Sequence, residues 1–422
     1  MRLPEVWRNI TTNTRISYDC TNLSQGAEAQ HMKQTNSIGG LKIAATFIGT
    51  VVGAGFASGQ EILQFFNIFR QQGLFAILVV SLLFIVFGYI IMSIGRKIGS
   101  DSHNHIINQV SGPFLGRIFD FIITFFLFGA FTAMAAGTGA MLQQQFRIPF
   151  LIGSALLTAL TALTVLFGVK GVVNAISMVV PFLLGSLILI CILVVFSTPF
   201  SELFTNLSAP FPGTSSHNPA AIGGDDVIGD TVIDNAVIGD AIGHSHNNDI
   251  SSNIVGNWFS SSILYVSYNT ILSIAVLGML GVNARNEKSV RRGAILGGLG
   301  LGVGILAIFL SIANYLPEVY AVEIPMLVVA GKVGLVAQLG FSIVLIAEMY
   351  TTAVGSLYSF MARMQVSSIS LKNTQMILIA SGAAFFASNL GFSNIVKYVY
   401  PVIGYSGILL LVLFLVRWRR VK

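Results

Sequence analysis

Three glycines fall within seven residues of an apolar stretch that runs from about residue 41 to residue 66. They are Gly49, Gly53 and Gly55, and each weakens a helix by about 1 kcal/mol relative to alanine. Inside hydrocarbon, every backbone N–H and C=O group that a broken helix frees must find another partner. The pattern therefore predicts a helix that breaks near its middle, at a place that is buried in protein or lines a polar cavity.

Composition indicates that this helix crosses a membrane with several others. The chain is 54% hydrophobic and only 9% charged, which is not typical of a soluble domain. Uncharged stretches such as Leu74–Gly95 and Ile148–Val169 are long enough to cross a hydrocarbon core of roughly 30 Å. Cys20 lies in a polar tail and Cys191 in an apolar stretch, so we expect no disulfide. The sequence predicts an all-α polytopic membrane protein.

The net charge of +6 does not indicate a nucleic-acid partner, because the basic residues fall in short loops between apolar stretches. Their distribution among these loops indicates instead which loops lie in the cytoplasm. We predict ten spans, at about 41–66, 74–95, 118–143, 148–168, 171–197, 256–279, 290–314, 333–362, 374–391 and 394–416. With the N-terminus in the cytoplasm, the outer segments hold only Arg70, Arg147, Lys332 and Lys397, and the other 19 of the 23 basic residues lie inside. This division predicts a multi-pass protein of the cell membrane with both termini in the cytoplasm.

The chain divides at an acidic loop. We expect a disordered cytoplasmic tail over 1–38, in which Met32 offers an alternative start, then a first five-helix repeat over 39–197. Residues 198–255 contain no Lys or Arg but several Asp and His residues, and we expect an extracytoplasmic, low-complexity loop there. A metal site is the alternative, although the Asp and His spacing matches no familiar ligand pattern. A second repeat over 256–416 and a basic tail over 417–422 follow.

A second polar interruption is expected in the sixth span. Tyr265, Ser267, Tyr268 and Asn269 form a polar cluster in the middle of 256–279, the first span of the second half. Paired interruptions at corresponding places of two halves indicate the substrate site of a secondary transporter. The alternative is that small and polar residues only let helices pack closely. On the first interpretation, the first and sixth helices are both discontinuous.

Several motifs resemble one bacterial family. The segments Phe47–Glu61, Tyr265–Asn269, Tyr350–Gly355 and Asn394–Tyr398 are similar to the YkvI-like membrane proteins, and the resemblance covers nearly all of 41–416. That family in turn resembles the amino acid–polyamine–cation transporter superfamily. The resemblance implies ten transmembrane helices arranged as a five-plus-five inverted repeat of the LeuT type.

The resemblance also implies a candidate sodium site. In sodium-coupled members of that fold, carbonyl groups before the first-helix break and groups on the eighth span surround one sodium ion. The residues that match are Gly49, Val52, Glu348, Thr351 and Thr352. An oxygen shell suits a hard cation. The alternative is that the threonine hydroxyls bond to carbonyls of their own helix.

Three charged residues offer coupling to protons instead. Lys170 opens the fifth span where some proton-coupled or exchanging relatives carry a lysine, and the alternative is an anchor whose side chain reaches the cytoplasmic surface. Glu348 lies near the centre of a span, where an acidic side chain is costly and is usually functional. Glu61 follows the first break and is a candidate for coupling or gating. The choice between sodium and proton stays open.

The solute is expected to be small. The N–H groups freed at the break suit a carboxylate, and the polar side chains of the sixth span could hold other polar groups. The predicted substrate residues are Thr50, Val51, Gly53, Ala54, Gly55, Tyr265, Ser267, Tyr268 and Asn269. The leading hypothesis is a cation-coupled symporter of an amino acid or related amine, without a cofactor beyond the candidate sodium ion. The alternative is a membrane sensor or scaffold that binds a solute without moving it. We expect no enzyme, because the spans carry no histidine and no HExxH motif.

Overall fold

The computed structural model describes residues 38–99, 103–167, 170–197, 205, 207–208, 255–366 and 373–421. The expected N-terminal tail and nearly all of the acidic loop lie outside these residues. The described part is built from helices, and its only β pairing is an isolated bridge between Ile38 and Ala284. The helices are α2 (Gly40–Val51), α3 (Ala54–Ala57), α4 (Gln60–Phe65), η2 (Asn67–Phe69), α5 (Gln71–Ile98), α6 (His103–Phe146), α7 (Phe150–Phe167), α8 (Lys170–Ser197), α12 (Trp258–Val282), α13 (Glu287–Ala313), α14 (Leu316–Val319), α15 (Pro325–Val333), α16 (Leu335–Val366), α17 (Asn373–Ser388), α18 (Phe392–Asn394), the π-helix η3 (Ile395–Val399) and α19 (Tyr400–Val421).

The helices confirm a polytopic membrane protein. Within the described residues, seven segments are long and apolar enough to cross a membrane: α5, α6, α7, α12, α13, α16 and the run from α18 through α19. Two shorter apolar helices accompany them, α2 and residues 182–197 of α8. Large apolar side chains such as Leu78 and Phe121 are exposed, as expected on surfaces that face lipid.

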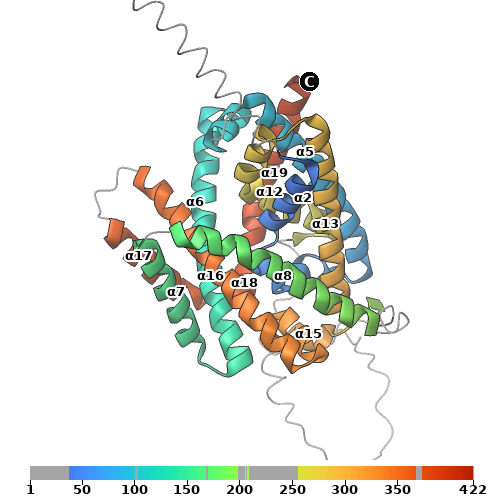
Figure 1. The fold of residues 1–422 in the computed structure, drawn as a ribbon, viewed down its shortest axis with the longest axis vertical. Coiled ribbons are helices and arrows are strands. Elements are labelled where there is room, and N and C mark those ends of the chain that lie inside the picture. The colour runs from blue at the N-terminus through green and yellow to red at the C-terminus, as the bar shows by residue number, and fades with distance from the viewer. Residues whose placement is uncertain are drawn as a thin grey trace, which may run out of the picture.

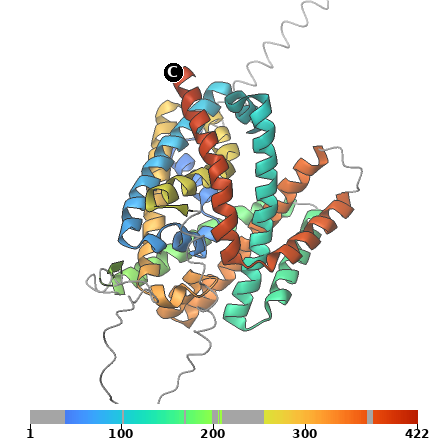
Figure 2. The ribbon, with the colours of Figure 1, turned by 180° about the vertical axis from the view of Figure 1, so that it is seen from behind.

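The helices form two groups (Figures 1 and 2). In Figure 1, α2, α5, α12, α13 and α19 lie on one side, and α6, α7, α16 and α17 lie on the other. In the first group α12 packs on α5 and α19, while α13 packs on α2 and α5. In the second group α16 packs on α6, and α17 packs on α6 and α7. Helix α8 crosses obliquely and contacts both α13 and α16.

Glycines bring the backbones of α5 and α12 into direct contact. A Cβ atom added at Gly95 would lie 2.4 Å from the carbonyl oxygen of Gly278, and one at Gly281 would lie 1.9 Å from that of Met92. Small residues at such crossings let two helices approach more closely than larger side chains allow. This packing holds α12 in the centre of the first group, where most of its residues are buried.

The first apolar stretch is broken, as predicted, but the sixth span is not. Helix α12 runs without a break from Trp258 to Val282, so the expected discontinuity of the sixth helix is wrong. Its polar side chains find partners without opening the helix. The Ser267 hydroxyl donates to the carbonyl of Gly404 on α19 at 2.7 Å, and the Asn269 amide donates to the carbonyl of Tyr265 on α12 itself at 2.9 Å.

Candidate functional site

The break in the first apolar stretch lies at Val52 and Gly53. Both residues have extended backbones, with ψ of 105° and −171°, and they separate α2 from α3. The N–H of Val52 still bonds to the carbonyl of Ile48 at 2.8 Å. The N–H groups of the next three residues, Gly53 to Gly55, have no hydrogen-bond partner among the described residues. The carbonyl groups of Gly49 and Val52 have none there either. These are the backbone groups that a helix end leaves without partners.

Gly53 borders open space. A Cβ atom added to it would have no heavy atom of another residue within 4 Å, and Gly53 is partly exposed whereas Ala54 and Gly55 are buried. Thr50 and Gly49 on the preceding turn are partly exposed too. The break is therefore open at Gly53, whereas the unpaired N–H groups of Ala54 and Gly55 belong to buried residues.

Glu61 lies on the other side of the break. The residue is 7% exposed, and one carboxyl oxygen, Oε2, accepts a hydrogen bond from the Tyr268 hydroxyl at 2.6 Å. The other oxygen, Oε1, occupies the space beside Gly55, because a Cβ atom added there would lie only 2.1 Å from it. Gly55 is thus needed for the carboxyl group to approach the backbone of the break. The contact joins α3 and α4 to α12.

Aromatic rings surround this carboxyl group. The Tyr268 ring lies 5.4 Å from that of Tyr265, 5.5 Å from that of Phe65 and 5.2 Å from that of Tyr400, measured between ring centroids. The Tyr265 hydroxyl is buried and has no hydrogen-bond partner among the described residues. A carboxyl group in such apolar surroundings requires a proton or a nearby cation. The arrangement is therefore suited to binding one or the other.

Helix α16 carries a second buried acid, Glu348. It packs against α3, the helix that follows the break. Glu348 on α16 is 4% exposed, and the Thr352 hydroxyl is close enough to hydrogen-bond its carboxyl group. The Thr351 hydroxyl donates to the Glu348 carbonyl at 3.0 Å. Within the described residues, Oε2 of Glu348 has no hydrogen-bond partner. The second acid can therefore still accept a proton or a cation.

Other predicted residues lie elsewhere or have local partners. The Thr50 hydroxyl donates to the carbonyl of Thr46 on its own helix at 2.7 Å. Val51 is buried, and Ser267 is turned towards α19. Lys170 begins α8, and its side chain lies outside the part of the chain that the structure describes.

The cap is the run from α14 through α15, Leu316–Val333, and it contacts the broken stretch at Ser58. The segment before α15 is held to α18 by Glu323, whose Oε2 accepts hydrogen bonds from the Ser393 N–H and hydroxyl at 2.5 and 2.8 Å. The amide of Gln144 on α6 both donates to and accepts from the backbone of Ile324, at 3.3 Å each. The Met326 N–H donates to the Ser58 carbonyl at 2.9 Å. The cap thus ties α6, α15 and α18 to the broken helix.

Sequence reasoning missed a second interruption of the first stretch and the residues that hold the cap. Gly59, with φ of +80°, separates α3 from α4, in a conformation that favours glycine. The Ser58-Gly59 dipeptide is a turn signal that could have found it. No comparable signal marks Gln144 or Ser393, because their partners are distant in sequence.

The helices and the broken first stretch define a multi-pass α-helical membrane protein in which one buried acid, Glu61, lies beside a helix break. No family model matches the chain. It is similar to the uncharacterised membrane protein YkvI of Bacillus subtilis, with 28% identity over 364 residues that span 86% of this chain and 92% of that protein. It is also similar to the uncharacterised protein YyaD of the same organism, with 27% identity over 376 residues, 89% of this chain and 96% of that protein.

The chain is also similar to proteins of known structure. Two mutants of the manganese transporter of Eremococcus coleocola have TM-scores of 0.47 and 0.48 to this chain, with 13% identity, and each comparison covers 89% of this chain and 85% of the other. The description of YkvI as a membrane protein agrees with the seven apolar helices that the described residues of this chain contain.

Proposed function

We propose that this protein is a secondary transporter that moves a small solute across the cell membrane by alternating access, coupled to sodium or to protons. The observation that carries the proposal is the break at Val52 and Gly53, whose unpaired backbone groups border open space beside the buried carboxyl group of Glu61. Irregular backbone is stable at membrane depth only where it is buried or lines a cavity, and transporters use such breaks to bind solutes and ions.

The proposed architecture has ten transmembrane segments in two inverted sets of five. The first set is the broken stretch α2–α4 followed by α5, α6, α7 and α8. The second set is α12, α13, α16, α17 and the run α18–α19, with α14 and α15 as the cap between α13 and α16. On this arrangement α12 and the broken helix are the first members of the two sets, and the Tyr268–Glu61 hydrogen bond supports their pairing.

Basic residues support the proposed orientation, with both termini in the cytoplasm. The Arg96 guanidinium near the end of α5 donates to the carbonyl of Ala284, between α12 and α13, at 2.9 Å. Those segments also carry Lys97, Arg285 and Lys288, and this concentration of positive charge is typical of the cytoplasmic side. The cap would then lie on the outer side.

An amino acid or a related amine is the solute class that we propose. Its carboxylate would accept hydrogen bonds from the N–H groups of Gly53, Ala54 and Gly55, and its ammonium group would meet the carboxyl group of Glu61. Tyr268 would position that carboxyl group. Ser267 and Asn269 contribute less than expected from the sequence, because their side chains already have backbone partners.

Two ions remain as alternatives within the proposal. A sodium ion would bind the free carbonyl groups of Gly49 and Val52 together with the Thr352 hydroxyl. A proton would be carried by Glu61, Glu348 or Lys170. The bond from the Thr351 hydroxyl to the Glu348 carbonyl supports neither choice, because both oxygen atoms keep acceptor capacity.

The experiment has two stages. The purified protein is first screened by thermal unfolding against amino acids and amines, with and without sodium and at several pH values. Any stabilising compound is then offered as a radiolabelled solute to proteoliposomes with a sodium or a proton gradient. We expect saturable uptake that follows one gradient and is lost in Glu61→Gln.

Variants separate the two ions. If Thr352→Ala loses sodium-dependent stabilisation and Lys170→Ala keeps it, the coupling ion is sodium. If stabilisation depends on pH, is lost in Lys170→Ala and is kept in Thr352→Ala, the coupling ion is the proton. Stabilisation without gradient-driven uptake would contradict the transport proposal and would indicate a sensor. Failure of every compound to bind or move would contradict it also.

A further inference from the structure

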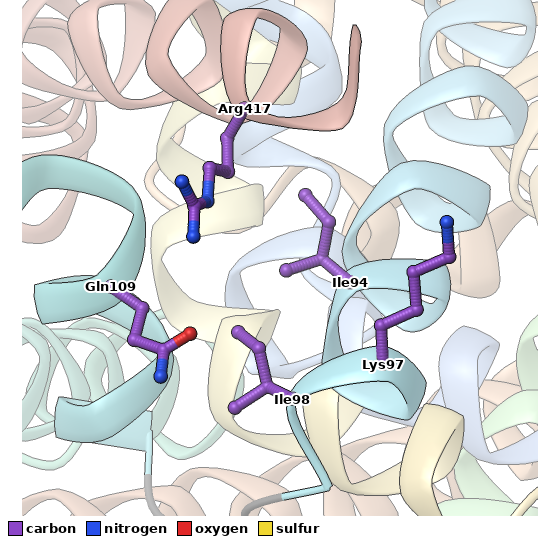
Figure 3. Close-up of a pocket in the computed structure, with 5 residues that line it drawn as sticks. All are labelled: Ile94, Lys97, Ile98, Gln109 and Arg417. Carbon is purple, nitrogen blue, oxygen red and sulfur yellow. The ribbon is translucent and has the colours of Figure 1, made fainter. Parts of the chain in front are cut away.

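A cavity lies at the other end of the first helix group from the cap. Its volume is about 250 Å³, and its lining residues come from three helices: Ile94, Lys97 and Ile98 of α5, Gln109 of α6 and Arg417 of α19. Figure 3 shows the Arg417 and Gln109 side chains reaching towards the space from α19 and α6, with the two isoleucines of α5 opposite them. The cavity is thus formed only when α5, α6 and α19 come together.

The lining combines two kinds of surface. Lys97 and Arg417 supply positive charge and Gln109 an amide, while Ile94, which is 3% exposed, and Ile98 supply an apolar floor. The described lining contains no acidic residue. Two basic residues in the described lining favour an anion, and a guanidinium group is especially suited to phosphate oxygens. The apolar floor suits a ligand that also carries hydrocarbon.

Neighbouring aromatic residues indicate the depth of the cavity in the membrane. Trp418 follows Arg417 and packs edge-on against Tyr89 of α5, with 6.4 Å between the ring centroids. The Tyr89 hydroxyl donates to the Glu287 carboxylate at 2.9 Å. Trp and Tyr residues with one apolar and one polar end gather where hydrocarbon meets the lipid headgroups. The cavity therefore lies at the level of the headgroup phosphates.

We propose that this cavity binds the phosphate group of an anionic phospholipid, with Lys97 and Arg417 as its cationic contacts and Gln109 as a hydrogen-bond donor. The cavity is smaller than the roughly 300–1,000 Å³ of typical small-molecule pockets. It has room for a headgroup and leaves the acyl chains outside along α5 and α19. Basic pockets between transmembrane helices on the cytoplasmic side are known to take such headgroups. This proposal does not depend on the protein being a transporter.

The test measures lipid binding to the full-length protein in detergent by native mass spectrometry and thermal unfolding. The lipids are phosphatidylglycerol, which is anionic, and phosphatidylcholine, which has the same phosphate but no net charge. The double variant Lys97→Gln and Arg417→Gln should bind phosphatidylglycerol roughly 30-fold more weakly than the wild type, because each direct contact of a basic side chain with the bound phosphate contributes about a fivefold effect.

A matched control removes the same charge at the same end of the molecule. Lys288 and Arg292 are exposed on α13 and do not line the cavity, so changing both to glutamine should weaken binding less than about threefold. Wild-type affinity for phosphatidylglycerol in the cavity variant would overturn the proposal. Equal losses in both variants would overturn it as well, since general surface charge would then explain the binding.

Two further measurements keep the test decisive. If the double variant does not fold, the single variant Lys97→Gln is used, because Lys97 is exposed and its replacement disturbs no core. A roughly fivefold loss is expected from it, and no loss would contradict the proposal. Inorganic phosphate is added as a separate ligand. Stabilisation by millimolar phosphate equal to that by phosphatidylglycerol would overturn the assignment to lipid.

Discussion

Replacing Gly55 with alanine tests the contact between the helix break and the buried acid. The added Cβ atom would lie 2.1 Å from Oε1 of Glu61 and 3.1 Å from its Cδ. A carbon and an oxygen atom without a bond between them need roughly 3.3 Å. The carboxyl group must therefore move by about 1 Å or the backbone of the break must shift.

The displacement removes a strong hydrogen bond. The Tyr268 hydroxyl and Oε2 of Glu61 are 2.6 Å apart, and a shift of about 1 Å takes them beyond the usual range for O–H···O bonds. Overpacking of a core costs about 1–3 kcal/mol, and leaving a buried polar group without its hydrogen-bond partner costs a similar amount. Because one rearrangement causes both effects, we expect Gly55→Ala to lose about 2 kcal/mol of stability.

The assay is thermal unfolding of the purified protein in a single detergent, with Gly53→Ala as the matched control. Gly53 lies two residues away, has φ of −123° and has no heavy atom of another residue within 4 Å of its added Cβ atom. Any residue can adopt that backbone, so Gly53→Ala should stay within about 0.5 kcal/mol of the wild type. Gly55→Ala should lower the unfolding midpoint by a few degrees.

A double variant identifies the cause. If Gly55→Ala acts by breaking the Glu61–Tyr268 hydrogen bond, its effect and that of Tyr268→Phe overlap, and the double variant is less destabilised than the sum of the two. Equal stability of Gly55→Ala and Gly53→Ala would refute the reasoning. Strict additivity in the double variant would show that the glycine and the hydrogen bond act separately.

Three other predictions concern the central cluster, the helix crossing and the cap. Tyr268→Phe leaves a buried carboxyl group without its donor and should cost about 1–3 kcal/mol in thermal unfolding, whereas Tyr265→Phe removes a hydroxyl without a partner among the described residues and should cost little. Gly281→Ala places a methyl group against the backbone of α5 and should cost at least about 1–3 kcal/mol, whereas Gly340→Ala meets no neighbour and should stabilise α16 slightly in the same assay. Glu323→Ala detaches the cap from α18 and should speed deuterium exchange in the segment before α15, as measured by mass spectrometry; unchanged exchange would contradict that role.

The first helix break was predictable because its cause is local. Gly49, Gly53 and Gly55 lie close together in a stretch whose length and composition already require a membrane span, so a break could be expected from the sequence alone. The polytopic, all-helical class was predictable for the same reason. Both features follow from residues that are close together in sequence, so they can be predicted without knowledge of contacts between distant residues.

The unbroken sixth span shows where sequence reasoning fails. Ser267 and Asn269 are polar residues in an apolar stretch, and the sequence cannot distinguish a helix that opens from one whose polar groups are satisfied by packing. Ser267 does not open the helix because its hydroxyl donates to the carbonyl of Gly404, which is 137 residues away in sequence. The pairing of Glu61 with Tyr268 was missed for the same reason, although both residues were singled out as candidates.

The short helix α4 lies between the contacts of the cap and the buried acid Glu61. Gly59 has a left-handed backbone, and a Cβ atom there would lie 2.8 Å from Cγ of Met326, so α15 packs directly on the second interruption of the broken helix. The N–H of Met326 also bonds to the carbonyl of Ser58, while Glu61 follows two residues after Gly59 and bonds to α12. The short helix α4 is therefore held between α15 and α12. Any motion that opened the break on the cap side would have to release the bond of Ser58, and the hydrogen bond of Glu61 to α12 would resist the movement of α4. The cap and α12 thus hold α4 from two sides, and the Glu323 and Gly55 variants disturb these two sets of contacts separately.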